Sequence, residues 1–295
     1  ASAQTAFPGA VRGEAALQAL GARLEQVAAA HDVAADELRA ALKREQTLWL
    51  TPDDKLVYLD APPARAETSG AAPAASFAGT EIPLEDAFNL STNPNSKKVI
   101  FLDFDGHHSK NNGWGHNIVF PPFNTSGISS SFTDGELREI IDTWRLVAED
   151  FAPYKVNVTT IEPPEDLLRK SVINDKAWGV RVLMTQSTSG FAAGTGGVAL
   201  LGSFDDFFDT PCFAFNKGVN NGSMTASHEV GHTFGLFHDG LFGQEYHPGT
   251  SGATPSWGPI MGAPFGRTVV QWSVGDYSGA TTTQQDLAII AGTVG

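Results

Sequence analysis

The sequence predicts an α/β fold of the α+β type, built on a mixed sheet and preceded by a small helical N-terminal segment. Two observations support this prediction. Strand-like and helix-like segments alternate beyond residue 97, which is typical of mixed sheets. Residues 61–80 are rich in Ala, Pro, Ser and Gly and have the composition of a linker. We therefore expect two parts, residues 1–80 and residues 81–295.

The composition is that of a globular protein. Of the 295 residues, 41% are hydrophobic and 18% are charged, so a core of ordinary size can be buried. No apolar run reaches the ~18 residues that a membrane-spanning helix needs. The 33 acidic residues outnumber the 19 basic ones, and a net charge of −14 disfavours binding to phosphate backbones. We expect a monomer whose partners include neither a membrane nor a nucleic acid.

The single cysteine, Cys212, cannot form an internal disulfide. Missing disulfides usually indicate a reducing compartment, but many bacterial secreted enzymes lack them too. The chain opens on Ala1-Ser2-Ala3, which resembles the end of a signal sequence or the remnant of a tag. We expect a secreted protein of bacterial type, with Cys212 as a buried small hydrophobe rather than a thiolate near a metal.

The elements are predicted in chain order from local signals. Apolar residues recur every three or four positions within residues 8–46, which indicates two helices, and residues 55–59 have a strand pattern. Thr133 and Glu136 form a capping box and predict a helix over residues 133–151. The other expected strands are residues 98–104, 154–161 and 180–186, and the other expected helices are residues 163–176 and 281–291.

A glycine-rich segment with an apolar centre lies at residues 191–204. Glycine within a strand is typical of a place where another backbone approaches closely, which suits an exposed sheet edge. Such an edge can pair with an extended peptide. The residues expected to bind substrate are Gly197, Val198, Ala199 and Leu200. The alternative is an edge strand without a ligand.

The strongest chemical signal is a histidine motif that begins at residue 228. His228 and His232 are four residues apart, so on a helix they lie on one face and can both reach one zinc ion. Ser223 offers an N-cap just upstream. Glu229 would lie about 60° around the helix from His232. From there it can take a proton from a zinc-held water without ligating the metal.

His238 cannot reach the same ion from the same helix. Placed on that helix it would lie about 9 Å beyond His232, so the helix must end between them. Gly235 tolerates the left-handed conformation that ends helices and can turn the chain back. Three neutral imidazoles leave a fourth position open, which is typical of catalytic zinc. A chance match of these residues is on the order of one in 10⁵ for such a chain.

The extended His-Glu-x-x-His-x-x-Gly-x-x-His pattern resembles the metzincin clan of zinc endopeptidases. The clan also has a tight turn with a methionine beneath the zinc, and residues 257–262, which contain Met261, look like that turn. Asp239 resembles the reprolysin-like (adamalysin) group, and no tyrosine follows Met261 within a few residues as in astacins and serralysins. The resemblance covers roughly residues 97–295 and departs from animal reprolysins in lacking disulfides.

This resemblance implies a metzincin catalytic domain with a twisted mixed sheet, an active-site helix and a Met-turn in which Met261 packs under the imidazoles. It implies an endopeptidase that acts on a protein or peptide, with Zn²⁺ as cofactor and Glu229 as the base that activates the zinc-held water. Two other functions stay open: a zinc-binding protein without proteolytic activity, and a zinc hydrolase of a non-protein amide.

Residues 1–80 lie upstream of the part that the resemblance covers. Secreted proteases commonly carry inhibitory prosegments, so we expect a latent zymogen, with a helical accessory domain as the alternative. No cysteine is present in this segment, which excludes a thiolate as the blocking ligand. The carboxylates that could block zinc are Asp53, Asp54, Asp60 and Glu81.

Two weaker clusters could bind further ions. One contains His107, His108 and His116, for which solvated loop histidines are the favoured interpretation. The other contains Asp205, Asp206 and Asp209, whose oxygens could hold Ca²⁺, although their spacing matches no known calcium loop.

Overall fold

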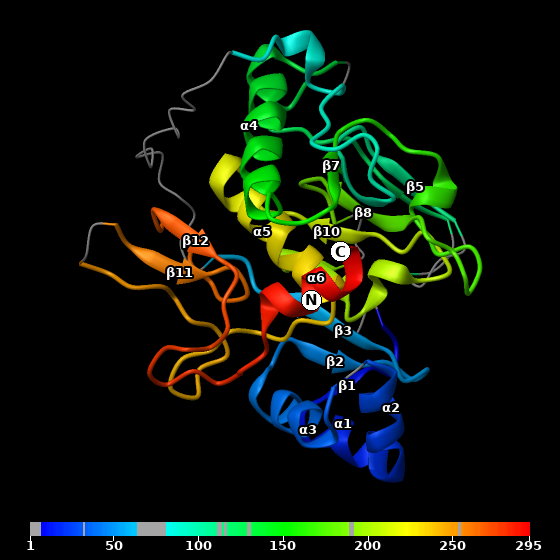
Figure 1. Cartoon of the computed structure of the whole chain (residues 1–295), viewed down its shortest axis with the longest axis vertical. Coiled ribbons are helices and arrows are strands. Elements are labelled where there is room, and N and C mark those ends of the chain that lie inside the picture. Colours follow the sequence, from blue (N-terminus) through cyan, green and yellow to red (C-terminus); the bar gives the residue numbers. More distant parts are fainter. Residues whose placement is uncertain are drawn as a thin grey trace.

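The structure, a computed structural model, describes residues 7–31, 33–63, 81–110, 114, 117–128, 131–188, 192–252 and 255–295. It has the predicted α/β character, and its main sheet has eight strands (Figure 1). In spatial order these strands are β1 (Val11–Arg12), β2 (Leu48–Leu50), β3 (Leu56–Asp60), β9 (Gly197–Leu200), β10 (Cys212–Ala214), β8 (Trp178–Met184), β4 (Lys98–Asp103) and β7 (Asn157–Thr159).

The sheet is mixed, as expected. β10, β8, β4 and β7 are parallel to one another. β9 runs antiparallel to β10, and β3, β2 and β1 add further antiparallel pairs. β4 is buried on both faces: Ile100 and Leu102 lie in the main apolar core, whereas Val99 and Phe101 contact a smaller cluster around Leu168. A strand covered on both sides in this way has a continuous apolar sequence instead of an alternating one.

Two long helices cover the main-core face of the sheet. α4 (Asp134–Asp150) starts at the predicted capping box, in which the Thr133 side chain accepts from Glu136 N and the Glu136 side chain accepts from Thr133 N. α5 (Val219–Thr233) packs on β8, β9 and β10 and lies along α4 (Figure 1). α5 therefore crosses the sheet next to β9, and this position decides what the residues of α5 face.

The N-terminal part contains the predicted helices and three strands. α1 (Gly13–Leu20), α2 (Leu24–Ala30) and α3 (Ala35–Arg44) pack on β1, β2 and β3, the blue region of Figure 1. Their apolar cluster includes Leu38 and Tyr58, and it also takes in Leu201 and Phe237 from the later part of the chain. The two parts thus share one sheet and part of one core. Of the expected linker, residues 64–80 lie outside the described residues.

The predicted edge strand is not an edge in the full chain. β9 lies between β10 and β3, and the pairing with β3 runs from Val57 opposite Leu200 to Asp60 opposite Gly197. All four residues of β9 are buried. The local pattern identified the strand correctly. The prediction that the strand lies at an exposed edge was wrong, because β3 from the N-terminal segment pairs with it.

One predicted helix is absent. Residues 163–176 contain only a short 3₁₀ helix, Glu165–Leu167. Beyond it the Asp175 carboxylate accepts from the backbone N–H and the hydroxyl of Ser171, which competes with helical pairing. Two other elements are shorter or later than expected, namely β7 and α6 (Asp286–Val294).

The remaining elements are small. They are the 3₁₀ helices Gly21–Arg23, Leu84–Asp86 and Ser203–Asp205, and the two-stranded pairs β5 (His107–Ser109) with β6 (Ile118–Phe120) and β11 (Trp257–Pro259) with β12 (Val269–Gln271). In the part of the chain that the structure describes, no helix is long and apolar enough to cross a membrane.

Candidate metal centre

α5 presents the first two histidines and the glutamate of the motif. It starts earlier than expected: Gly218, at φ 86°, is the N-cap, and its N–H donates to the Glu139 carboxylate at 3.1 Å. Ser223, the predicted N-cap, lies inside the helix. His228, Glu229 and His232 are all buried in the last three turns.

The helix ends as the sequence predicts. Its last residue is Thr233, and Gly235 adopts φ 96°, the left-handed conformation that favours glycine. The Leu236 N–H then donates back to Gly231 O at 3.2 Å, a bond typical of left-handed helix ends. The turn brings His238 back to the helix that it has just left.

The three imidazoles converge on one point. His232 Nε2 lies 3.1 Å from His228 Nε2 and 3.2 Å from His238 Nε2. On the far side of two rings, His228 Nδ1 lies 2.7 Å from Ile260 O and His232 Nδ1 lies 2.7 Å from Leu236 O. Because a carbonyl oxygen only accepts, Nδ1 of each ring carries a proton, and in the neutral ring the Nε2 lone pair can bind a metal.

His238 has acidic neighbours on its outer side. Its Nδ1 lies 3.4 Å from Glu245 Oε1 and 3.5 Å from Glu45 Oε2. The buried Glu45 also accepts a hydrogen bond from Tyr58, whose ring stacks on His232 at 3.7 Å between centroids. These residues carry no sequence signal that links them to the histidine motif.

The methionine turn lies under the helix. Gly262 N donates to Pro259 O at 3.0 Å, which closes a tight turn around the fully buried Met261. A Cβ on Gly231 would overlap the Met261 sulfur, so the missing side chain on α5 makes room for it. Met261 O accepts from Asp239 N at 2.9 Å, so the turn also holds the loop that carries His238.

Asp60, at the end of β3, reaches all three histidines. Its Oδ2 lies 3.0 Å from His228 Nε2 and 3.2 Å from His232 Nε2, and its Oδ1 lies 3.4 Å from His238 Nε2. Together the four residues form a buried cluster that could hold a metal ion. Burial would raise the pKa of Asp60, but the charge of His238 and hydrogen bonds from the histidines hold it well below its ordinary value.

The other carboxylates considered as blocking ligands lie elsewhere. Asp53 accepts from Thr51 and pairs with Lys55. Asp54 pairs with Arg23, and Glu81 pairs with Arg138. The structure therefore selects Asp60 from the four candidates, because only Asp60 continues β3 into the histidine cluster.

Glu229 lies beside this cluster. A Cβ on Gly197 would overlap the Glu229 carboxylate, so the strand and the glutamate are in close contact. Neither carboxylate oxygen of Glu229 has a hydrogen-bond partner among the described residues. Asp60 lies near enough to influence the pKa of Glu229. Burial, followed by the charge of Asp60, raises the pKa of Glu229 well above its ordinary value.

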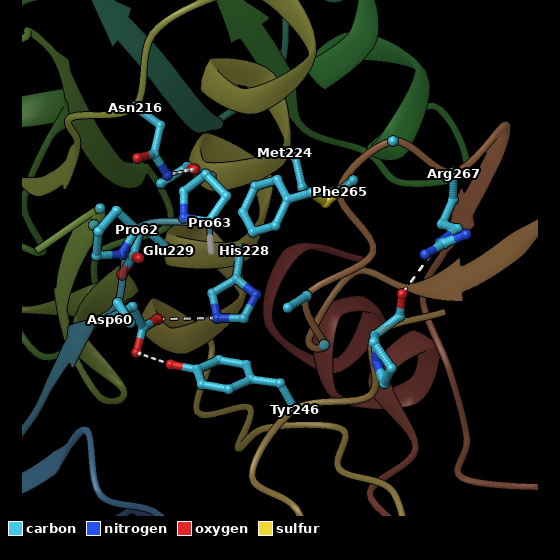
Figure 2. A pocket seen from close by; sticks show the side chains of 18 residues that line it. Asp60, Pro62, Pro63, Asn216, Met224, His228, Glu229, Tyr246, Phe265 and Arg267 are labelled. Atoms are coloured by element: carbon cyan, nitrogen blue, oxygen red, sulfur yellow. Dashed lines mark hydrogen bonds and ion pairs between the residues drawn. The ribbon is translucent and has the colours of Figure 1, made fainter. Parts of the chain in front are cut away.

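A cavity of about 610 Å³ opens from the cluster (Figure 2). Met224 and Phe265 form part of its apolar wall, and Pro62 and Pro63, which follow Asp60, also line it. Pro248 and residues of the segment 262–267 contribute much of the rest. The N-terminal segment therefore enters the same cavity that lies next to the candidate base.

Tyr246 was not singled out by the sequence. Its hydroxyl donates to Asp60 Oδ1 at 3.0 Å, while His228 lies at Oδ2, as Figure 2 shows. The Tyr246 ring lies 4.2 Å from the His238 ring, measured between centroids. No spacing rule places a tyrosine eight residues after the third histidine, so only the folded chain reveals this contact.

The weaker candidates do not gather into metal-binding clusters among the described residues. His107 and His108 lie on β5, and His116 lies outside the described residues. The three aspartates predicted for calcium bind different partners: Asp205 pairs with Lys170, Asp206 accepts from Thr210, and Asp209 pairs with Arg181. Cys212 is fully buried, as expected.

The sequence matches no protein-family model, and a search of curated proteins finds no significant match.

Proposed function

We propose that this protein is a zinc-dependent endopeptidase that is made in a latent form. In this proposal His228, His232 and His238 hold the zinc ion and Glu229 is the catalytic base. The observation that carries the proposal is the position of Asp60, whose carboxylate faces the Nε2 atoms of all three histidines. A carboxylate there would occupy the position that catalytic zinc sites keep open for water.

The donor set fits zinc. Imidazole nitrogens and carboxylate oxygens are ordinary zinc ligands, and catalytic sites commonly use three protein ligands. Hydrogen bonds from ring Nδ1 to backbone carbonyls orient His228 and His232, as is usual for metal-ligating histidines. The mixed sheet, the helix α5 and the turn at Met261 support the metzincin resemblance.

Glu229 would do the proton transfers. When bound, zinc would act as a Lewis acid that lowers the pKa of a water and polarises the scissile carbonyl. Glu229 would take the proton from the attacking water and return it to the leaving amine. Gly197 leaves space for the glutamate beside the strand, and the carboxylate has no protein hydrogen bond to break first.

An extended peptide would bind along β9, in the place that β3 holds in the full chain. β3 shows that this edge accepts an antiparallel strand over four residues, ending at Gly197 next to Glu229. The apolar cavity beside Met224 and Phe265 would take a substrate side chain. The same geometry would account for latency, because Asp60 blocks the metal position and a substrate strand would have to displace β3 from β9.

Substituting Asp60→Ala in the full chain tests the proposal. We expect this variant to bind zinc and to cleave unfolded casein at least about tenfold faster than the unprocessed wild type. Adding Glu229→Ala should lower turnover by about 10²–10⁴-fold while zinc stays bound. Casein cleavage, bound zinc and intact mass would be recorded on the same samples.

Asp53→Ala is the matched control, since Asp53 lies in the same segment but pairs with Lys55 away from the cluster. It should stay as latent as the wild type. A folded, zinc-loaded Asp60→Ala variant that cleaves no casein, even after its chain has been cut between residues 63 and 81 and the fragments have been separated, would contradict the endopeptidase and leave a zinc site with another substrate or none.

A further inference from the structure

The hydroxyl of Tyr246 faces the metal-binding cluster and depends on the N-terminal segment for its partners. It donates to Asp60 Oδ1 at 3.0 Å and lies 3.3 Å from Thr47 Oγ1. Both partners belong to residues 1–80. When this segment leaves, the phenol loses both of them, and its ring still lies beside the His238 ring.

The two carboxylate oxygens of Asp60 lie where the two oxygens of a reacting substrate carbon would lie. Its Oδ2 lies against His228 and His232, and its Oδ1 lies toward His238 and Tyr246. A carboxylate has two oxygens on one carbon, as does the tetrahedral carbon that forms when water adds to an amide. The oxygen that accepts from Tyr246 therefore corresponds to one oxygen of that tetrahedral species.

We infer that Tyr246 is a further catalytic residue, which donates a hydrogen bond to the oxyanion of the tetrahedral intermediate. This inference rests on the endopeptidase function proposed above. As water adds to the carbonyl carbon, Glu229 takes one proton of the water and the C=O π electrons move to the carbonyl oxygen. Tyr246 stabilises that oxygen by its O–H and keeps its own proton. The C–N bond then breaks, and Glu229 returns the proton to the nitrogen.

The segment that carries Tyr246 is anchored without the N-terminal part. His247 N donates to Asp239 O at 2.7 Å, and Ala263 N donates to His247 O at 2.9 Å. The Tyr246 ring also packs on His238. These contacts join the tyrosine to the third histidine and to the methionine turn, and they do not involve the N-terminal segment, whereas the bonds of Gln46 and Thr47 to Glu245 would be lost.

A phenol suits this role. Its ordinary pKa of about 10 keeps it protonated at neutral pH, so it can donate without first binding a proton. A donor aimed at the place where charge develops acts on the transition state more than on the substrate. Removing one such donor typically lowers kcat by about 10²–10³-fold.

The test compares Tyr246→Phe with Tyr277→Phe, both made in the Asp60→Ala chain and both measured after the chain has been cut between residues 63 and 81 and the N-terminal fragment removed. Tyr277 is the matched control, because its hydroxyl bonds to Asp239 and Gly240 O nearby but away from the cluster. We expect Tyr246→Phe to lower kcat by about 100-fold with KM changed less than about threefold, and Tyr277→Phe to stay within about threefold in both.

A second measurement does not depend on turnover. Calorimetry would compare a phosphinic peptide, whose tetrahedral phosphorus carries two oxygens, with the matching cleavage-product peptide. Tyr246→Phe should weaken phosphinate binding by about 10–100-fold and leave product binding and zinc content unchanged. Equal losses for both ligands, or no loss for either, would overturn the catalytic role.

The outcomes separate the two proposals. An Asp60→Ala parent that holds zinc but neither cleaves peptides nor binds the phosphinate contradicts the endopeptidase, and the role of Tyr246 fails with it. A parent that does both, with Tyr246→Phe indistinguishable from it, contradicts only the role of Tyr246.

Discussion

At two glycines, the absence of a side chain makes room for a neighbouring residue of the candidate metal centre. Gly197 and Gly231 each face a functional side chain, Glu229 in one case and Met261 in the other. Neither glycine has positive φ, so backbone conformation does not require it. Their role is close approach: a methyl group at either position would occupy the place of the side chain opposite.

Gly231→Ala should disturb the contact between α5 and the methionine turn. The new methyl group would overlap the Met261 sulfur, which is fully buried and cannot move away cheaply. We expect a loss of about 1–3 kcal/mol of unfolding free energy and weaker zinc binding. Urea denaturation of the zinc-free protein and a competitive zinc titration would measure the two effects.

Gly222→Ala, on the same helix, is the matched control. Its methyl group would lie 3.5 Å from Asn216 O and 3.8 Å from Met184 Cε, which are ordinary contacts. This variant should gain about 0.5–1 kcal/mol from helix propensity. If both alanine variants behaved alike, the fit between α5 and the methionine turn would not matter.

Among the elements, β3 combines a structural role with the inhibitory role proposed above. It is hydrogen-bonded to β2 on one side and to β9 on the other, and Tyr58 stacks on His232. Glu245 adds bonds to the backbone N–H groups of Gln46 and Thr47. β3 is therefore an interior strand of the sheet, although it belongs to the segment that has to leave in the proposed activation.

Cutting the chain between residues 63 and 81 should therefore not release the N-terminal segment at once. Strand pairing on both sides of β3 and the shared apolar cluster remain after the cut. We expect both fragments to elute together on size-exclusion chromatography, with a denaturing gel showing complete cleavage, and casein activity to appear only as they separate. Immediate separation with full activity would contradict the expectation that strand pairing and apolar contacts keep the two fragments together.

The whole molecule should lose stability as the pH rises toward neutral. Several buried carboxyl groups have raised pKa values, and burial is the main cause in each: about 7 for Asp103, about 7 for Asp150 and about 8 for Asp286. A carboxyl group whose pKa is higher in the folded than in the unfolded state stabilises the fold fully below the unfolded value. That contribution is lost as the pH rises through the folded value.

Asp150 allows the sharpest test, since it lies half-buried at the end of α4 and accepts from Ser227 Oγ at 2.6 Å. From pH 4 to pH 8 its ionisation should remove up to about 4 kcal/mol, at about 1.4 kcal/mol per pKa unit. Asp150→Asn should flatten that part of the pH profile in urea denaturation. Asp36→Asn, whose side chain on α3 is exposed, should keep the wild-type slope.

Local patterns in the sequence predict much of the fold. The capping box of α4, the buried strand β4 and the helix end at Gly235 each depend on residues a few positions apart, and the structure has all three. The prediction failed at residues 163–176, where side-chain hydrogen bonds replace the helix. That competition is also local, but helical spacing does not reveal it.

Sequence spacing also predicts one part of the candidate metal centre. His228, His232 and His238 come together as predicted, because one helix and one glycine turn bring them to a common point. Sequence spacing is enough for this, since the three residues lie within eleven positions and the geometry of a helix is known.

Only the tertiary structure shows where β3 lies. Asp60 reaches His232 from 172 positions away, and it was one of four equal candidates until the sheet placed it. The contact of Tyr246 with Asp60 is likewise set by the path of a loop, and the cover over β9 comes from a strand about 140 residues earlier. Periodicity and spacing record which residues share a helix or a strand. They do not record which strands pair across the chain, because that choice depends on packing the whole sheet at once.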